Sequence, residues 1–286
     1  MADHPSHILR RHGLRAKHSW GQNFLGDDGA LDRIASALEL EPGEPVVEIG
    51  PGLGHLTRFV LDHGGQVTAI ERDRDMAAVL RKELPHERLK VVEANAADAK
   101  FAEVAGAGRV AVIGNIPYHL TSPILFSVLE QRETISRVVL TIQKEVAVRL
   151  GAEPGGRDYG LLPAVLGVWF DVRTLFDLPA HLFHPPPKVD SAVVRLWARE
   201  KPLAEVKNDA HFLKVVKAAF AQRRKTLLNS LKSDRTLGPT EALVRALEEA
   251  GIDGGRRAET LAPGEFAALH RALYAGTGDS SAASAP

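Results

Sequence analysis

Val46-Val47-Glu48-Ile49-Gly50-Pro51-Gly52-Leu53-Gly54 is the stretch that decides the fold of this 286-residue chain. It begins inside a short apolar run, Pro45–Ile49, which predicts a buried β-strand, and a helical pattern follows the glycines. A glycine loop between a strand and a helix lets a ligand approach the backbone closely. The third glycine stands two positions after the second, not three as in the dinucleotide fingerprint. This tighter spacing favours a ligand without a pyrophosphate, such as S-adenosylmethionine, although glycine-rich turns without a ligand also occur.

Strand-like and helical patterns alternate along the rest of the chain, which is typical of a parallel α/β sheet. The further strand candidates are Gln66–Ile70, Leu89–Glu93, Arg109–Ile113 and Arg137–Ile142, with Val165–Phe170 and Ala192–Trp197 as an antiparallel edge hairpin. The helix candidates of this part are Gly29–Leu40, Leu56–His63, Asp75–Lys82, Ser122–Glu130 and Gln143–Leu150. After Ala210 the pattern predicts only the helices Phe212–Leu231, Thr240–Gly251 and Pro263–Tyr274. We therefore expect an α/β domain over residues 1–203, a small all-helical domain over 204–275 and a disordered tail over 276–286.

Polar residues follow the strands that come after the glycine loop. Glu71 ends the second strand about 20 residues beyond the loop, where an acidic side chain can accept hydrogen bonds from ribose hydroxyls. Asp98 follows the third strand, in position to hold the adenine amino group of a cofactor, and Asn115 follows the fourth. Because parallel strand ends converge on one crevice, Gly50, Gly52, Glu71, Asp98 and Asn115 predict one cofactor site in a Rossmann-like sheet.

Asn115-Ile116-Pro117-Tyr118 carries a pattern that fits methylation of an exocyclic amine. The lone pair of adenine N6 is delocalised into the ring, so a general base alone helps little. The Asn115 side-chain oxygen and a nearby carbonyl can accept both N6 hydrogens and favour a pyramidal nitrogen. Pro117 fixes φ and holds the neighbouring carbonyls inward, and Tyr118 offers a ring on which a flipped base can stack. A simple proline turn after a strand is the alternative reading of this tetrapeptide.

Composition excludes several classes of protein. The chain has no cysteine, which excludes disulfides, thiol nucleophiles and zinc–thiolate sites, and we find no convincing ligand set for any metal. Neither a secretory signal nor a membrane-length apolar run is visible, so we expect a cytoplasmic protein that contacts no membrane. The net charge is zero, but residues 1–24 carry +3, residues 25–180 carry −7 and residues 181–286 carry +4. Positive ends fit a polyanion bound at the flanks of the catalytic body, although a solvated basic face gives the same pattern.

The chain from about Leu14 to Leu273 resembles the ribosomal RNA adenine dimethyltransferase family that modifies the small subunit. The resemblance rests on the residues above and on Gly21–Leu25, Phe183–Ser191 and Gln222–Leu227, with Ser19-Trp20 and Leu161–Pro163 as small departures. It implies a class I S-adenosylmethionine-dependent methyltransferase that dimethylates N6 of two adjacent adenosines in the 3′-terminal hairpin loop of 16S rRNA. It also implies that Asn23 and Leu25 contact the cofactor, that Phe183 packs on the target base opposite Tyr118, and that Arg223, Arg224 and Lys225 bind RNA.

These implications make small-subunit rRNA within a ribosomal subunit precursor the expected partner of a monomeric enzyme. Two other readings stay open. A large-subunit adenine methyltransferase of the macrolide-resistance kind shares the cofactor loop and the catalytic motif, and a non-catalytic assembly factor could keep the fold alone. The basic Gln222–Leu227 segment favours the small-subunit enzyme over the first, and the intact cofactor residues argue against the second.

Overall fold

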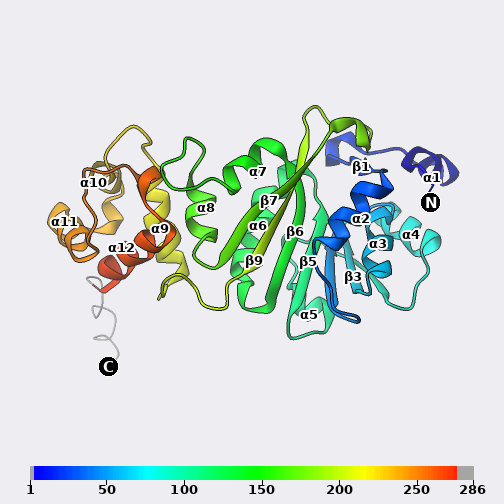
Figure 1. Cartoon of the computed structure of the whole chain (residues 1–286), viewed down its shortest axis with the longest axis horizontal. Helices are drawn as coiled ribbons and strands as arrows, with labels where there is room; N and C mark the ends of the chain where they lie inside the picture. The colour runs from blue at the N-terminus through cyan, green and yellow to red at the C-terminus, as the bar shows by residue number, and fades with distance from the viewer. Residues whose placement is uncertain (1–2, 276–286) are drawn as a thin grey trace, which may run out of the picture. The chain divides into compact units, whose positions relative to one another are not determined.

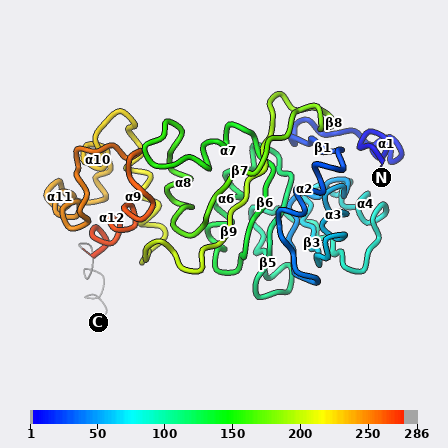
Figure 2. Tube along the Cα trace, in the orientation of Figure 1, coloured from blue at the N-terminus to red at the C-terminus, as the bar shows by residue number. Residues whose placement is uncertain are grey.

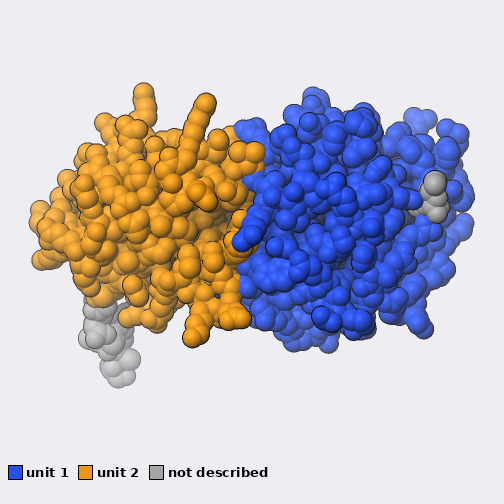
Figure 3. All heavy atoms as spheres, in the orientation of Figure 1, with its two compact units in different colours: residues 1–147, 173–198 blue, residues 148–172, 199–286 orange. Residues whose placement is uncertain are grey.

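The computed structural model describes residues 3–275, and this part of the chain belongs to two compact units (Figure 3). The first unit comprises residues 1–147 and 173–198, and the second comprises 148–172 and 199–286. The domain boundary expected near residue 204 stays a prediction. The expected tail, 276–286, lies outside the described residues.

A seven-stranded sheet forms the body of the first unit (Figure 1). Its strand order is β4-β3-β2-β5-β6-β9-β7. The strands are β2 Pro45–Ile49, β3 Gln66–Glu71, β4 Leu89–Glu93, β5 Val110–Asn115, β6 Ile135–Gln143, β7 Phe170–Leu178 and β9 Ser191–Ala198. The five strands β4, β3, β2, β5 and β6 all run parallel, and β9 is antiparallel to β6. The structure is therefore a mostly parallel α/β sheet, and its carboxyl strand ends lie at one edge.

Helices pack on this sheet through apolar side chains. The α-helices of this part are α2 Asp28–Ser36, α3 His55–Asp62, α4 Arg74–Glu83, α5 Phe101–Ala105, α6 Thr121–Glu130 and α7 Lys144–Leu150, and the 3₁₀ turns are η1 His18–Trp20, η2 Tyr118–Leu120, η3 Arg132–Thr134 and η4 Ala180–Leu182. Ile34 of α2 and Val60 of α3 are fully buried in one cluster with Val46 of β2 and Ile113 of β5. Burial of such side chains contributes roughly 1.5–3 kcal/mol each, so this cluster holds α2 and α3 on the sheet.

A second, two-stranded sheet joins two distant parts of the first unit. Strand β1, Phe24–Leu25, pairs antiparallel with β8, Phe183–His184, and the two segments run side by side in Figure 2. Before β1 lies α1, Pro5–Arg11, which the sequence reading did not predict although Pro5 occupies its first turn. Ile8 of α1 packs in a buried cluster with Phe24 and with Met76 of α4. The N-terminal segment is therefore anchored at both of its ends.

The second unit is helical except for the start of β7. Its α-helices are α8 Leu161–Leu166, α9 Asp209–Phe220, α10 Leu227–Leu231, α11 Thr240–Glu249 and α12 Pro263–Ala275, with 3₁₀ turns η5 Arg235–Leu237 and η6 Ala258–Thr260. Phe220 and Phe266 pack with ring centroids 5.6 Å apart, and Phe212 and Phe266 are fully buried. Aromatic packing thus forms the core of this unit. No described helix, in either unit, is both long and apolar enough to span a membrane.

The expected parallel strands are confirmed, but two predicted elements are wrong. Val165–Phe170 is not a strand: α8 covers Leu161–Leu166, and β7 begins only at Phe170. A short buried apolar run fits a helix and a strand equally well, and Pro163 in the first turn costs the helix no hydrogen bond. The edge partner of β9 exists as predicted, but residues 170–178 supply it.

Phe212–Leu231 is not one helix. Helix α9 ends at Phe220, and residues 221–226 form turns before α10 begins at Leu227. The Gln222 N–H donates to the Ser230 hydroxyl, and the N–H of the buried Leu227 donates to the Arg256 carbonyl. These tertiary hydrogen bonds replace the helical ones, so the basic segment lies on a turn between two helices.

Candidate active site

A pocket of about 260 Å³ lies in the first unit at the carboxyl ends of the parallel strands. Its lining comes from four successive strand ends, from the N-terminal segment and from β8. The main lining segments are Gly50–Leu53, Ile70–Arg72, Ala94–Ala96, Asn115–Leu120, Ser19–Leu25 and Phe183. All predicted catalytic residues and all predicted cofactor residues except Asp98 therefore lie around one pocket.

The glycine loop leaves its backbone accessible at one position and closed at another. A methyl group added to Gly50, whose φ is +64°, would meet no heavy atom within 4 Å. A ligand can therefore approach the backbone closely at Gly50. Gly52, with φ +56°, has no such room, because an added methyl group would stand 2.8 Å from the Phe24 ring. Phe24 thus packs directly on the loop.

Glu71 braces the glycine loop from the end of β3. Its carboxylate accepts hydrogen bonds from the Gly52 N–H at 3.1 Å and from the Asp73 N–H at 2.8 Å. Burial raises the pKa of Glu71, and the two backbone donors oppose that rise. The carboxylate therefore lies at the pocket wall in a fixed orientation.

Asn115 ends β5 with its amide held in one orientation. Its Nδ2 donates to the Asn23 carbonyl at 3.0 Å, and Asn23 Nδ2 donates to the Gly21 carbonyl at 3.2 Å. Because the Asn23 carbonyl can only accept, the amide nitrogen of Asn115 must face it. The Asn115 side-chain oxygen is therefore the atom left to accept a hydrogen bond from a ligand in the pocket.

Two aromatic side chains reach the same pocket from different elements. Tyr118, in η2 directly after Pro117, places its hydroxyl 2.8 Å from the Ser191 hydroxyl of β9. Burial raises the pKa of Tyr118, so this phenol is neutral at ordinary pH. Phe183 is 5% exposed and pairs with Leu25 through β8 and β1. Each ring is thus fixed by a contact that lies outside its own segment.

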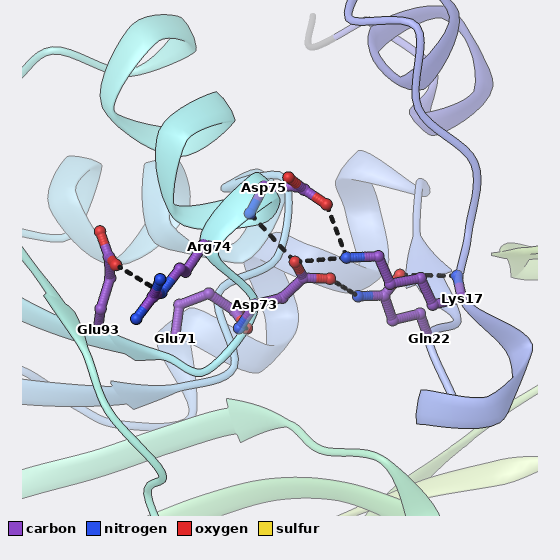
Figure 4. A network of polar contacts seen from close by, with 7 residues as sticks. All are labelled: Lys17, Gln22, Glu71, Asp73, Arg74, Asp75 and Glu93. Carbon is purple, nitrogen blue, oxygen red and sulfur yellow. Dashed lines mark hydrogen bonds and ion pairs between the residues drawn. The ribbon is translucent and has the colours of Figure 1, made fainter.

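A polar network ties the N-terminal segment to the start of α4, as Figure 4 shows. Lys17 Nζ donates to Asp73 and to Asp75, both at 2.7 Å, and Gln22 Nε2 donates to Asp73 at 2.8 Å. Asp73 is buried, and these donors lower its pKa although burial alone raises it. The segment that carries Asn23 and Leu25 is therefore held against the β3–α4 turn.

The model of the family described as "Ribosomal RNA adenine dimethylase" matches residues 13–273. The chain belongs to this dimethylase family. It is an rRNA adenine dimethyltransferase, and its fold is that of the class I methyltransferases.

Relatives in this dimethylase family match along almost the whole chain. The chain is 64% identical over 270 residues to the ribosomal RNA small subunit methyltransferase A of Myxococcus xanthus (strain DK1622), covering 94% of this chain and 95% of that protein. It is 50% identical to the enzyme of the same name from Anaeromyxobacter sp. (strain K), covering 96% and 100%.

Solved structures of related enzymes share the fold. A dimethyladenosine transferase from Plasmodium falciparum gives a TM-score of 0.75 at 26% identity, covering 86% of this chain and 95% of that one. The 23S rRNA methyltransferase ErmE gives 0.67 at 33% identity, covering 88% and 100%. The sheet and the pocket edge therefore lie in a fold on which other rRNA and adenosine methyltransferases are built.

Asp98 is the one predicted cofactor residue that does not line the dimethylase pocket. It accepts a hydrogen bond from Asn95 Nδ2 at 2.7 Å, and its own N–H donates to the Asn95 carbonyl at 3.1 Å. Asn95 does line the pocket. The structure thus places Asp98 behind Asn95, and a direct contact with the cofactor stays a prediction.

The predicted RNA-binding residues lie in the second unit, on the turn between α9 and α10. Arg223 is engaged there, because its guanidinium donates to the Arg157 carbonyl and stands 3.6 Å from the Glu259 carboxylate. Arg224 and Lys225 are exposed, and their side chains have no ion pair within residues 3–275. Two of the three cations are therefore available to phosphates.

Some pocket residues escaped the sequence reading. Trp20 is 38% exposed, and Lys17 and Arg72 stand 5.3 and 5.2 Å from its ring centroid. A single sequence does not show that Trp20 and Arg72, about 50 positions apart, lie close together. The departure of Ser19-Trp20 from the family pattern was the one signal at this position. Glu48, a carboxyl inside an apolar strand, is a visible anomaly of the opening motif. No group of three or more metal-ligating side chains occurs in the described part of the chain.

Proposed function

We propose that this dimethylase transfers methyl groups from S-adenosylmethionine to N6 of two adjacent adenosines in the 3′-terminal hairpin loop of 16S rRNA. The observation that carries this proposal is the meeting of Asn115, Tyr118 and Phe183 with the glycine loop and Glu71 around one pocket. The small-subunit assignment is supported by the relatives at 64% and 50% identity, both named for the small subunit. We infer that the enzyme acts in the cytoplasm as a monomer, on rRNA within a small-subunit precursor.

The glycine-loop side of the pocket would hold the methyl donor. Gly50 offers an open backbone, and the Glu71 carboxylate stands where two ribose hydroxyls can donate to it. Asn23 and Leu25 would close this side, since both line the pocket from the N-terminal segment. The donor supplies a methyl group made reactive by its attachment to a sulfonium sulfur, so these residues need only hold and orient it.

The Asn115 side would hold the target adenine. The base leaves its stack at a cost of a few kcal/mol, least in a loop, and would lie between Tyr118 and Phe183. The Asn115 side-chain oxygen would accept one N6 hydrogen. We assign the Ile116 carbonyl as the second acceptor, because the Pro117 carbonyl already accepts the Leu120 N–H at 2.9 Å. When both hydrogens are held out of the ring plane, the lone pair is localised on N6. Alignment of N6 with the donor methyl group supplies much of the remaining rate enhancement.

Methyl-acceptor assays with isolated ribosomal subunits test this proposal. Purified chain and labelled methyl donor would be mixed with small or large subunits from cells that lack this methylation. We expect incorporation into small subunits only, with mass spectrometry of rRNA fragments placing two methyls on each of two neighbouring adenosines. Label in neither subunit, or single methyls at scattered sites, would remove the proposed reaction.

The same assay decides between the proposal and the large-subunit alternative. One observation favours that alternative, namely the 33% identity to the 23S rRNA methyltransferase ErmE. Label confined to large subunits would establish it. A non-catalytic assembly factor would label neither subunit and would not bind the methyl donor.

A further inference from the structure

Glu48 is a buried carboxyl group that the proposed reaction does not use. It is 1% exposed near the end of β2, directly before the glycine loop, and it lines the pocket. Residues two apart in a strand share a face, so Glu48 lies on the side of Val46, where α2 and α3 pack. Leu31, Ile34 and Leu56 of these helices line the same wall. The carboxyl group thus stands beside apolar side chains of the pocket wall.

One oxygen of this carboxyl group has no partner. Within the described residues, Glu48 Oε2 makes no hydrogen bond. A buried polar atom without a partner costs roughly 1–3 kcal/mol, so this oxygen destabilises the fold unless a ligand satisfies it. An unpartnered oxygen at the pocket wall fits a contact with a donor group that enters the pocket.

The surroundings of Glu48 keep its proton in place. Burial above all, opposed by the Thr57 hydroxyl and assisted by the nearby Glu71 carboxylate, raises the pKa of Glu48 to about 8. Its register neighbours, Ala69 on β3 and Ile113 on β5, carry no charge. From α3, the His55 ring lies 2.9 Å from the Asp3 carbonyl, and burial lowers the pKa of His55, so it brings no positive charge. Near neutral pH, Glu48 therefore carries a proton.

We propose that Glu48 is the counter-ion of the ammonium group at the amino-acid end of the methyl donor, and that it releases its proton to solvent when this group binds. The inference rests on the proposed use of S-adenosylmethionine. An ammonium group supplies both what the site lacks, a hydrogen-bond donor for Oε2, and a charge that stabilises the carboxylate.

The sulfonium group is the poorer partner for this carboxylate. Its charge disappears from sulfur as the methyl group moves, so a fixed negative charge beside it would stabilise the donor and oppose transfer. The ammonium charge is the same before and after transfer. A carboxylate paired with the ammonium group therefore binds donor and product equally and anchors one end of the molecule.

Calorimetry of the product, S-adenosylhomocysteine, tests the inference, because it keeps the ammonium group and lacks the sulfonium. Titrations in buffers of different ionisation enthalpy count the protons released on binding. A group whose pKa of about 8 falls well below 7 on binding releases about 0.9 proton at pH 7 and about 0.5 at pH 8. The matched ligand is 5′-methylthioadenosine, which keeps the adenosine part and lacks the amino-acid end. We expect it to release no proton.

Glu48→Gln is the matched variant, since it keeps the shape and cannot ionise. We expect it to abolish proton release, to weaken S-adenosylhomocysteine binding tenfold or more, and to change 5′-methylthioadenosine binding less than twofold. Release that persists in Glu48→Gln, or equal release with both ligands, would overturn the inference and point to Glu71 instead. The pH series on the unchanged chain needs no variant, so the test stands even if the substitution impairs folding.

The two proposals fail in different ways. If the chain binds S-adenosylhomocysteine without releasing a proton, the role of Glu48 is wrong and the proposed methyl donor stands. If the chain binds neither compound, the proposed reaction itself is wrong.

Discussion

The Asn115 amide shows how one hydrogen bond can decide which side-chain atom is left to accept from a ligand. The amide nitrogen is committed to the Asn23 carbonyl at 3.0 Å, which leaves the oxygen for the substrate. The partner comes from a segment 92 residues earlier in the chain, so the orientation of this amide depends on the N-terminal segment.

Asn115→Ala should lower the methyl-transfer rate by about 100- to 1000-fold, as expected for loss of one preorganised hydrogen-bond partner of the reacting group. Affinity for S-adenosylhomocysteine should change much less, since Gly50 and Glu71 remain. Single-turnover rates and calorimetry measure the two quantities. The control is Asn229→Ala, the same change at an exposed position of α10. Near-normal turnover of Asn115→Ala would remove this side chain from the mechanism.

Two substitutions of Tyr118 distinguish the contribution of its ring from that of its hydroxyl group. Tyr118→Phe loses only the bond to Ser191 and keeps the ring, so we expect the transfer rate to fall less than about tenfold. Tyr118→Ala loses the stacking face, which is worth roughly 1–3 kcal/mol per base, or about 5- to 150-fold in substrate affinity. Rate and affinity measurements with small subunits check both. If the two variants were equally impaired, the hydroxyl rather than the ring would be the functional part.

The turn between α9 and α10 shows what a single sequence can and cannot predict at the scale of elements. The basic segment was found, but it was placed on a helix, because Phe212–Leu231 lacks glycine and proline and reads as one continuous pattern. The break depends on hydrogen bonds from Gln222 to Ser230 and from Leu227 to Arg256, which no local pattern reveals. As a result Arg223 turns back into its own unit, while Arg224 and Lys225 stay exposed.

Arg224→Ala combined with Lys225→Ala should therefore weaken RNA binding and flatten its salt dependence. Each lost phosphate contact removes roughly 0.7–0.9 from the slope of log affinity against log salt, so the pair should lower it by about 1.5. Filter binding to the rRNA hairpin at several salt concentrations measures the slope.

The control for this pair is Lys232→Ala with Arg245→Ala, two exposed cations of the same unit. If the salt-dependence slope fell equally for both pairs, the overall positive charge of the unit, and not this turn in particular, would attract the RNA. Arg223→Ala should instead lower the melting temperature, because its contacts are internal.

The parallel strands and the glycine loop were predictable because apolar runs, glycine spacing and polar residues at strand ends are local signals. Glu71 and Asn115 were found in this way. The cofactor contact of Asp98 stays a prediction, because strand-end position alone does not distinguish a pocket-lining residue, here Asn95, from the residue that it contacts. Trp20 and the Lys17–Asp73 contact were missed, since the chain meets itself there across more than 50 residues.

Two buried groups with opposite pKa shifts should set how the stability of the whole molecule depends on pH. His270 is fully buried and hydrogen-bonds to His211 at 2.9 Å, and burial lowers its pKa to about 4. The unfolded chain binds this proton below about pH 6.5, so stability falls as the pH drops from 6.5 to 4. Glu48 has a raised folded pKa of about 8, so its contribution falls as the pH rises from 4.5 to 8.

Chemical unfolding between pH 4 and pH 8 checks both signs. His270→Gln should flatten the pH dependence of the unfolding free energy between pH 6.5 and 4, because the native histidine costs about 3 kcal/mol of stability at pH 4. Glu48→Gln should flatten the pH dependence of the unfolding free energy between pH 4.5 and 8 instead. If either variant changed this dependence in the opposite direction, the protonation state assigned to that group would be wrong. Urea midpoints at constant slope distinguish a change in stability from a change in the unfolded state.

The pairing of β1 with β8 has a consequence for how the enzyme comes into being. Phe183, which lines the pocket, pairs with Leu25 from about 160 residues earlier in the chain, and Ser191 contacts Tyr118 from 73 residues later. A nascent polypeptide that has emerged only through β6 already contains five strands of the sheet but neither Phe183 nor Ser191. Competence to modify RNA therefore arises late in translation, after the five parallel strands of the sheet have already emerged.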